Sequence, residues 1–252
     1  FYATTPEKSV LTTAPPSAFG FLDRTSYGEI SNHGFLEVSD GKAVSFVGGD
    51  ITVENGNIFA PRGTVNIISA PSGGEVVSGA AGYSVDSFAK MGTVNVVETR
   101  PLQERPVRLD LPIGNIDVSG ASGGNIFIRA GGFVMDGGFL YADTLADGNG
   151  MGIDMRLTDR ISLVNGSVIA SRSYGVGAAG GISITAPFLG MDGGSVVSSR
   201  ANSSGKAGDI SLTTDTLDIR DSYVNASTYS AGRGGEISVR AAEQVNIAGY
   251  FT

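Results

Sequence analysis

Apolar residues in the second half of the chain recur at a fixed interval of 28 positions. One row holds Leu140, Val168, Val196 and Val224, and a second holds Phe133, Ile161, Leu189, Leu217 and Val245. A compact enzyme core does not require constant spacing, whereas each coil of a solenoid presents a similar side chain to the coil stacked on it. The spacing therefore predicts an all-β solenoid, and we expect these nine residues to stack in its core.

Each repeat contains three short segments in which apolar and polar residues alternate. In one repeat these are the segments of Ile126 and Ile128, of Phe133 and Met135, and of Leu140 and Ala142. Alternation with period two is typical of strands, and parallel pairing would hold successive coils about 4.8 Å apart. Parallel crossovers are almost always right-handed. The pattern predicts a right-handed parallel β-helix with three strands per coil and about 28 residues per coil.

The amino-terminal half follows a shorter step. Strand-like segments at 49–53, 56–60 and 63–67 recur every 7 residues, which predicts one strand for each segment. Residues 97–113 interrupt this pattern with three prolines and a cluster of Arg and Glu. We expect residues 1–96 to form a β-helix segment with short coils, 97–113 an insertion or a hinge, and 114–252 the regular repeats.

A longer polar stretch follows the third strand of each repeat. These stretches span 143–151, 171–179, 199–207 and 227–234, are rich in Gly, Ser and Ala, and differ from repeat to repeat. Loops on a rigid scaffold often carry recognition, but solvated connectors would have the same composition. Both interpretations stay open at this stage.

Composition and charge narrow the classes of function. The 252 residues include 38 Gly and no Cys, and the formal net charge is −8. Such a charge argues against binding to nucleic acid or to an anionic membrane. The absence of Cys excludes disulfides and thiolate metal sites. No apolar run reaches the roughly 18 residues of a membrane-spanning helix, and the first residues lack the features of a signal peptide.

Parts of the sequence resemble a known family of exported proteins. The resemblance rests on Ala14-Pro15-Pro16-Ser17-Ala18-Phe19-Gly20-Phe21-Leu22, Val47-Gly48-Gly49-Asp50-Ile51-Thr52-Val53 and Ala60-Pro61-Arg62-Gly63. These motifs are similar to the filamentous-haemagglutinin-like exoproteins of Gram-negative bacteria, near or just downstream of their secretion domain. The resemblance implies a right-handed parallel β-helix, export by two-partner secretion through an outer-membrane partner, and an adhesive or structural role at the cell surface. A complete secretion domain is missing, so we expect a processed product or a fragment.

Candidate catalytic residues are sparse, and we expect no enzyme. The single histidine, His33, lies in a polar Ser-Asn-His-Gly sequence and is expected to be a turn residue. Asp136 and Asp192 occupy stacked positions, as the carboxylates of a polysaccharide-cleaving β-helix would. They lie two coils apart, however, and an Asp that caps the backbone of a corner turn explains them better.

Two further kinds of site are candidates only. Asp143, Asp147 and Asn149 form an oxygen-rich loop that could hold Ca²⁺, although their spacing matches neither the EF-hand nor the Gly-Gly-x-Gly-x-Asp repeat; no other cofactor is expected. Asn165, Asn202 and Asn225 each begin an Asn-x-Ser sequon and are candidate glycosylation sites. Chance matches are common in a chain rich in Asn, Gly and Ser, so an ordinary polar loop and unmodified asparagines are the competing interpretations.

Three hypotheses on function follow. The first is an extracellular adhesin stalk or a filament subunit, whose apparently uncapped ends could stack end to end. The second is a carbohydrate-active β-helix enzyme. The third is a module that binds host or surface glycans through the loops of the repeats.

Overall fold

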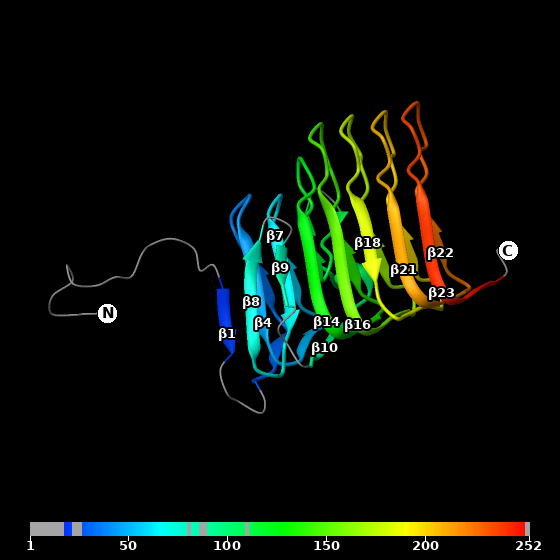
Figure 1. Cartoon of the computed structure of the whole chain (residues 1–252). Coiled ribbons are helices and arrows are strands. Elements are labelled where there is room, and N and C mark those ends of the chain that lie inside the picture. The colour runs from blue at the N-terminus through cyan, green and yellow to red at the C-terminus, as the bar shows by residue number, and fades with distance from the viewer. Residues whose placement is uncertain (1–17, 22–26, 80–81, 86–89, 109–110, 250–252) are drawn as a thin grey trace.

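The computed structural model describes residues 18–21, 27–79, 82–85, 90–108 and 111–249 (Figure 1). Parallel β-strands dominate this part of the chain, and it contains no α-helix. Accordingly, the described residues include no helix that is long and apolar enough to cross a membrane. The prediction of an all-β chain with parallel strands is confirmed.

Seven short strands form one parallel sheet, here called the third column. In sheet order they are β3 (Phe35–Glu37), β6 (Asn57–Phe59), β13 (Ile116–Asp117), β15 (Phe139–Tyr141), β17 (Val168–Ala170), β20 (Val196–Ser198) and β22 (Tyr223–Asn225). Every neighbouring pair is parallel. Each strand therefore stacks on the equivalent strand of the preceding repeat.

An eleven-stranded sheet holds the other two columns. The first column consists of β4 (Ala43–Gly48), β7 (Thr64–Ser69), β18 (Gly181–Thr185) and the amino-terminal halves of β14 (Asn125–Asp136), β16 (Gly152–Val164), β21 (Ile210–Arg220) and β23 (Ile237–Ala248). The second column consists of β2 (Ile30–Asn32), β5 (Ile51–Glu54), β10 (Thr93–Val97), β19 (Phe188–Met191) and the carboxyl-terminal halves of the four long strands. The three 7-residue steps of the amino-terminal half are thus β5, β6 and β7, one strand each.

In four repeats the first two predicted strands are continuous. β14 and β21 each run through both columns, with a register shift between Ala130 and Gly132 and between Thr214 and Thr216 relative to the next strand. Among the regular repeats of the described residues, the two strands are separate only as β18 and β19. The corner between these columns is therefore a bend within a strand, because an irregularity in the ladder re-aims the chain without ending the hydrogen bonding.

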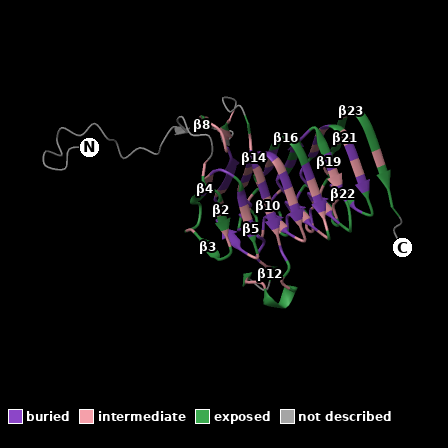
Figure 2. Cartoon of the chain, turned by 90° about the horizontal axis from the view of Figure 1, so that it is seen from below, coloured by how far each residue is buried: buried purple, intermediate pink, exposed green. Residues whose placement is uncertain are grey.

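The core lies between the columns and follows the predicted stacking where a further coil covers it. Phe133, Ile161, Leu189 and Leu217 are fully buried. Val245, the fifth member of that row, is 50% exposed because it lies on β23, whose only strand partner among the described residues is β21 (Figure 2). Burying a large apolar side chain contributes about 1.5–3 kcal/mol before entropy is subtracted, so stability accumulates coil by coil.

The predicted 28-residue row of the third column is wrong at two positions. Leu140 pairs with Ile169 rather than with Val168, and Ile169 pairs with Val197 rather than with Val196. Ile169 and Val197 are fully buried. The two predicted core residues, Val168 and Val196, are only partly buried.

The cause is the length of the corner that precedes the strand. Five positions separate Met135 from Leu140, but six separate Leu163 from Ile169, and one extra residue moves every following side chain to the opposite face of a strand. Val224 pairs with Val197 and packs against the core, so the row returns to the predicted face there.

Two segments interrupt the columns. β8 (Gly74–Gly79) pairs antiparallel with β1 (Ala18–Phe21) and with β9 (Gly82–Ser84). Within the predicted segment 97–113 lie the 3₁₀ helix η2 (Leu102–Glu104) and the antiparallel pair β11 (Val107–Arg108) and β12 (Leu111–Pro112). On either side of this second segment, β10 and β13 pair with strands both before and after it in their own columns. The stacking of the coils therefore continues across it.

The long loops of the repeats stand side by side at one edge of the stack (Figure 1). Parallel bridges join Thr144 to Ser173, Ser173 to Ala201 and Ala201 to Thr228 at the base of these loops. A fourth parallel bridge joins Thr144 to Gly120 in the coil before. We call this row of loops, 143–151, 171–179, 199–207 and 227–234, the loop comb.

Candidate functional site: a cavity at the base of the loop comb

Backbone contacts between glycines bring the loops of the comb together. A Cβ atom on Gly177 would lie 1.8 Å from the carbonyl oxygen of Gly148, and one on Gly205 would lie 2.0 Å from that of Gly177. Gly232 repeats the relation with Gly205, at 1.9 Å. Only glycine permits so close an approach of two backbones. The four glycines therefore hold neighbouring loops at the spacing of the coils, which gives the side chains at their base fixed relative positions.

An ion pair between two coils lies at this base. Asp143 lies two residues after β15 of the third column, and Arg172 lies two residues after β17 in the next coil. The Arg172 Nε lies 3.1 Å from Oδ1 and 3.0 Å from Oδ2 of Asp143, its Nη2 also donates to Oδ2, and its backbone N–H donates to Oδ1. Burial opposes the charge of Arg172, but the carboxylate of Asp143 outweighs it and raises the pKa of Arg172. The acceptor positions of Asp143 are thereby occupied.

Aromatic side chains surround this ion pair. The guanidinium carbon of Arg172 lies 4.6 Å from the ring centroid of Tyr141 and 5.8 Å from that of Tyr174. Burial raises the pKa of Tyr141 to about 12 although Arg172 opposes the shift, so the hydroxyl stays protonated at neutral pH. Stacking of a cation on an aromatic face is worth more when both are removed from water. The rings hold the guanidinium in place.

A buried carboxyl group lies one coil earlier. Asp117 pairs in register with Phe59 on one side and Tyr141 on the other. It accepts hydrogen bonds from the backbone N–H groups of Gly114, at 3.0 Å, and Ser119, at 2.8 Å. Burial raises the pKa of Asp117 to about 6, although these hydrogen bonds lower it and the nearby Asp143 raises it further.

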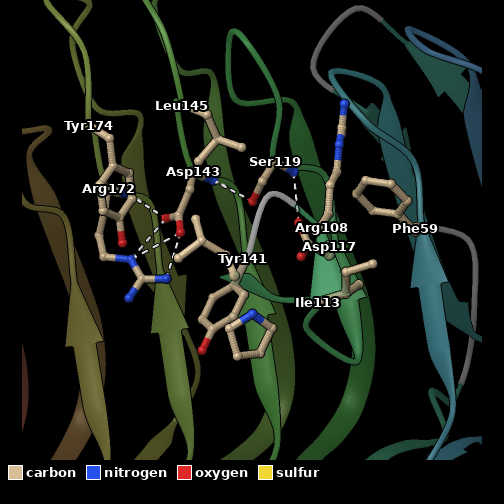
Figure 3. A pocket seen from close by; sticks show the side chains of 12 residues that line it. Phe59, Arg108, Ile113, Asp117, Ser119, Tyr141, Asp143, Leu145, Arg172 and Tyr174 are labelled. Atoms are coloured by element: carbon tan, nitrogen blue, oxygen red, sulfur yellow. Dashed lines mark hydrogen bonds and ion pairs between the residues drawn. The ribbon is translucent and has the colours of Figure 1, made fainter. Parts of the chain in front are cut away.

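Residues of the segment 97–113 join these side chains in lining a cavity of about 110 Å³ (Figure 3). Its lining combines Phe59, Tyr141, Tyr174, Asp117, Ser119, Asp143, Leu145 and Arg172 with Arg108, Leu111, Pro112 and Ile113 from that segment. The Arg108 guanidinium carbon lies 5.2 Å from the ring centroid of Phe59. The cavity therefore has aromatic walls, one titratable carboxyl group and a fixed ion pair, and it can hold a compact polar group.

A buried polar network attaches the covering segment to the coils. Glu98 accepts hydrogen bonds from Arg100 Nε and Nη2, at 2.9 and 2.7 Å, and from Asn115 Nδ2, at 2.9 Å. Burial opposes ionisation of Glu98, but the hydrogen bonds and charge of Arg100 dominate and lower its pKa. Asn115 also donates to the carbonyl of Gly56 and accepts from the N–H of Phe139, which ties three coils together.

The structure does not bring the three candidate calcium ligands together around an ion. Asp143 faces Arg172, whereas Asn149 accepts the N–H of Ala178, at 2.9 Å, and Asp147 faces the N–H of Val176, at 3.5 Å. No group of three His, Asp or Glu side chains in the described residues has the arrangement of a metal site. These acidic and amide groups instead link the first loop of the comb to the second.

The candidate glycosylation sites differ in exposure. Asn165 is exposed in a corner turn and donates to Asp136, at 2.8 Å. The Nδ2 atom of Asn202 is buried, and Asn225 is partly buried with its Oδ1 accepting the N–H of Ser227. Of the three, Asn165 alone presents an exposed side chain, so glycosylation stays a prediction that this residue fits best.

The two stacked aspartates of the sequence have local partners. Asp136 accepts from Asn165, and Asp192 accepts the N–H of Gly193, at 2.6 Å. Asp192 thus binds a backbone N–H at its corner, as predicted, whereas Asp136 binds a side-chain amide of the next coil. His33 is exposed, 3.6 Å from Glu54. None of these side chains lines the cavity.

Sequence reasoning missed most of the site. Asp117, Tyr141 and Arg172 belong to different coils, and no local motif joins them. One signal was present: Asp143 and Arg172 are opposite charges about one repeat apart, at equivalent positions of the predicted stack.

The comparisons with known proteins add nothing to the geometry, because no protein-family model, no curated protein and no solved structure matches the chain.

Proposed function

We propose that the chain is a right-handed parallel β-helix that serves outside the cell as a structural or adhesive scaffold. The observation that carries the proposal is the in-register parallel stacking of three strand columns from β2 to β23. Stacked repeats give a rigid body whose length grows with the number of coils and whose surface is displayed along its edges. The right hand follows from the general preference of parallel crossovers.

Export and location belong to the same proposal. The motifs at 14–22, 47–53 and 60–63 are similar to filamentous-haemagglutinin-like exoproteins, and on that basis we propose secretion through an outer-membrane partner. The absence of cysteine and the low charge content suit a chain that crosses the envelope unfolded. An extracellular or cell-surface location follows from this part of the proposal.

End-to-end stacking of a second copy is the form of assembly that we propose. The apolar side chains of Ile237, Val239, Val245 and Ile247 on β23 are between 40% and 66% exposed. At the opposite end of the stack, Phe35 and Leu36 on β3 are 50% and 38% exposed. An unpaired strand with an exposed apolar row readily accepts another strand.

Sedimentation velocity over a range of concentrations, with electron microscopy of the same samples, tests this assembly. Wild-type protein should form particles that lengthen in steps of one chain. The variant Val245→Lys with Ile247→Lys should stay monomeric, because two charges would be buried in the junction. Lys substitution of exposed Val176 in the loop comb is the matched control and should leave assembly unchanged. Strictly monomeric wild-type protein at high concentration would contradict end-to-end assembly.

Glycan binding at the loop comb is the second candidate function. The cavity beside the comb, with its aromatic walls and polar groups, favours it over inert connectors. An enzymatic role is less well supported, because the acceptor positions of Asp143 are occupied by Arg172, which leaves it a poor general base. Polysaccharide cleavage that is abolished by Asp117→Asn would favour the enzymatic role over glycan binding.

A further inference from the structure

Two arginines occupy equivalent places in successive coils, but only one has a carboxylate partner. Arg172 and Arg200 each precede a bridge residue at the base of the loop comb, as Asp143 does one coil earlier. Arg172 binds the carboxylate of the preceding coil. The residue that precedes Arg200 in the stack is Arg172, another cation. In the part of the chain that the structure describes, Arg200 makes no ion pair, and its Nε is buried without a hydrogen-bond partner.

A second donor without a partner lies beside Arg200. Asn202 is two residues further along the loop base, and its Nδ2 is also buried with no hydrogen-bond partner. Leaving buried N–H groups unpaired costs free energy that a bound acceptor recovers. The guanidinium plane and the amide thus offer donors to an acceptor that this part of the chain does not supply.

Tyrosine rings flank these donors on both sides. Tyr174, Asn202 and Tyr229 each follow a bridge residue in successive coils, so the two tyrosines lie two coil spacings apart, roughly 9.6 Å. The guanidinium carbon of Arg200 lies 5.2 Å from the ring centroid of Tyr229, and its charge opposes the rise that burial causes in the pKa of Tyr174. Tyr229 is 67% exposed and Tyr174 36%. Both tyrosine side chains are therefore partly open to solvent, and one face of each ring carries an arginine.

The local charge selects an anion. Arg172 and Arg200 lie one coil apart, and Asp143 compensates only one of them. A guanidinium fork binds a carboxylate through two parallel hydrogen bonds, as Arg172 binds Asp143. Exposed tyrosine rings supply the apolar contact that the carbon-bound face of a sugar ring requires.

We propose that Arg200, Asn202, Tyr174 and Tyr229 form a binding site for a carboxylate-bearing sugar, namely a uronate unit of an acidic polysaccharide. The carboxylate pairs with the guanidinium of Arg200, Asn202 donates to a ring or hydroxyl oxygen, and a tyrosine stacks on the sugar. The site would give the proposed scaffold a class of ligand. Sugar binding itself does not depend on the proposed adhesive role, but its purpose in the cell rests on that proposal.

Calorimetric titration with a trigalacturonate tests the site on the intact chain. Binding should be saturable, while the neutral trisaccharide of galactose should bind at least about tenfold more weakly, because it lacks the charged acceptor. Arg200→Gln should weaken trigalacturonate binding by a similar factor. Arg233→Gln removes the same charge from an exposed arginine of the comb and should leave affinity within about twofold.

Two further variants distinguish a loss of binding from a loss of folding. Arg200→Lys keeps the charge without the fork and should also weaken binding, and Tyr229→Ala alters an exposed ring and should weaken it while leaving thermal unfolding unchanged. Equal binding of the neutral sugar, equal loss in Arg233→Gln, or preference for a glutamate-rich peptide would each overturn the proposal. Such failures would leave the scaffold proposal intact if sedimentation still showed end-to-end assembly.

Discussion

At the scale of single residues, one buried carboxyl group decides how the cavity responds to pH. Asp117 is 3% exposed and accepts two backbone N–H groups, yet burial raises its pKa to about 6. Because the folded-state pKa exceeds that of an unfolded aspartate, about 3.9, the native state holds the proton more tightly. The stabilising contribution of this proton is complete below about pH 4 and is lost as the pH rises through about 6.

We predict that the Asp117 carboxyl carbon titrates in an NMR experiment with a midpoint near 6. The free energy of unfolding should lose about 2–3 kcal/mol between pH 4 and pH 7 from this group, and Asp117→Asn should remove that component of the pH dependence. Asp192, which is exposed at a corner, provides the matched control. The variant Asp192→Asn should leave this pH dependence of the free energy of unfolding unchanged. A midpoint below 4.5 for Asp117 would contradict the buried environment described for it.

At the scale of the elements, the corners between strands decide which residues enter the core. The rule that strands recur about every 28 residues, and their parallel pairing, could be predicted from Phe133, Ile161, Leu189 and Leu217. The face of β17 could not, because the extra residue between Leu163 and Ile169 is invisible to a fixed spacing. For the same reason the ion pair across 29 residues and the cavity under the segment 97–113 escaped prediction: both depend on contacts between coils rather than on local pattern.

The corrected register of β17 gives a direct comparison between two adjacent residues. Ile169→Ala should destabilise the protein by about 2–5 kcal/mol, because it leaves a cavity in the core. The predicted core residue Val168 faces outward, so Val168→Ala should cost less than about 1 kcal/mol. Denaturant unfolding measures both changes. A larger loss of stability in Val168→Ala than in Ile169→Ala would mean that Val168 faces the core, as the fixed 28-residue spacing predicts.

The glycines of the comb allow a second comparison at this scale. Gly177→Ala places a Cβ atom against the Gly148 carbonyl and should destabilise the fold by about 1–3 kcal/mol through forced separation of two loops. Gly34 has open space around its Cβ position, so Gly34→Ala should change stability little. Thermal unfolding of the two variants checks this. Equal midpoints would mean that the loops are not held in contact.

At the scale of the whole molecule, coils that stack in register position every site described above. The loop comb, the cavity, the proposed binding site at Arg200 and the exposed strand β23 all depend on equivalent residues that lie one coil apart. Several small departures, such as the split of β18 from β19 and the inserted segment 97–113, are accommodated because each coil needs to match only its neighbours. A chain of this kind tolerates variation in its loops while its columns stay aligned.

Disulfide cross-linking tests this stacking most directly, since the natural chain has no cysteine. Ser183 and Ser211 are register partners on β18 and β21, and paired strands lie about 4.8 Å apart, within the range that a disulfide spans. Under mild oxidation the folded double variant Ser183→Cys with Ser211→Cys should form the bond. Ser183→Cys with Thr213→Cys, two residues out of register, should not. Cross-linking of the second pair in preference to the first would contradict the stacked architecture.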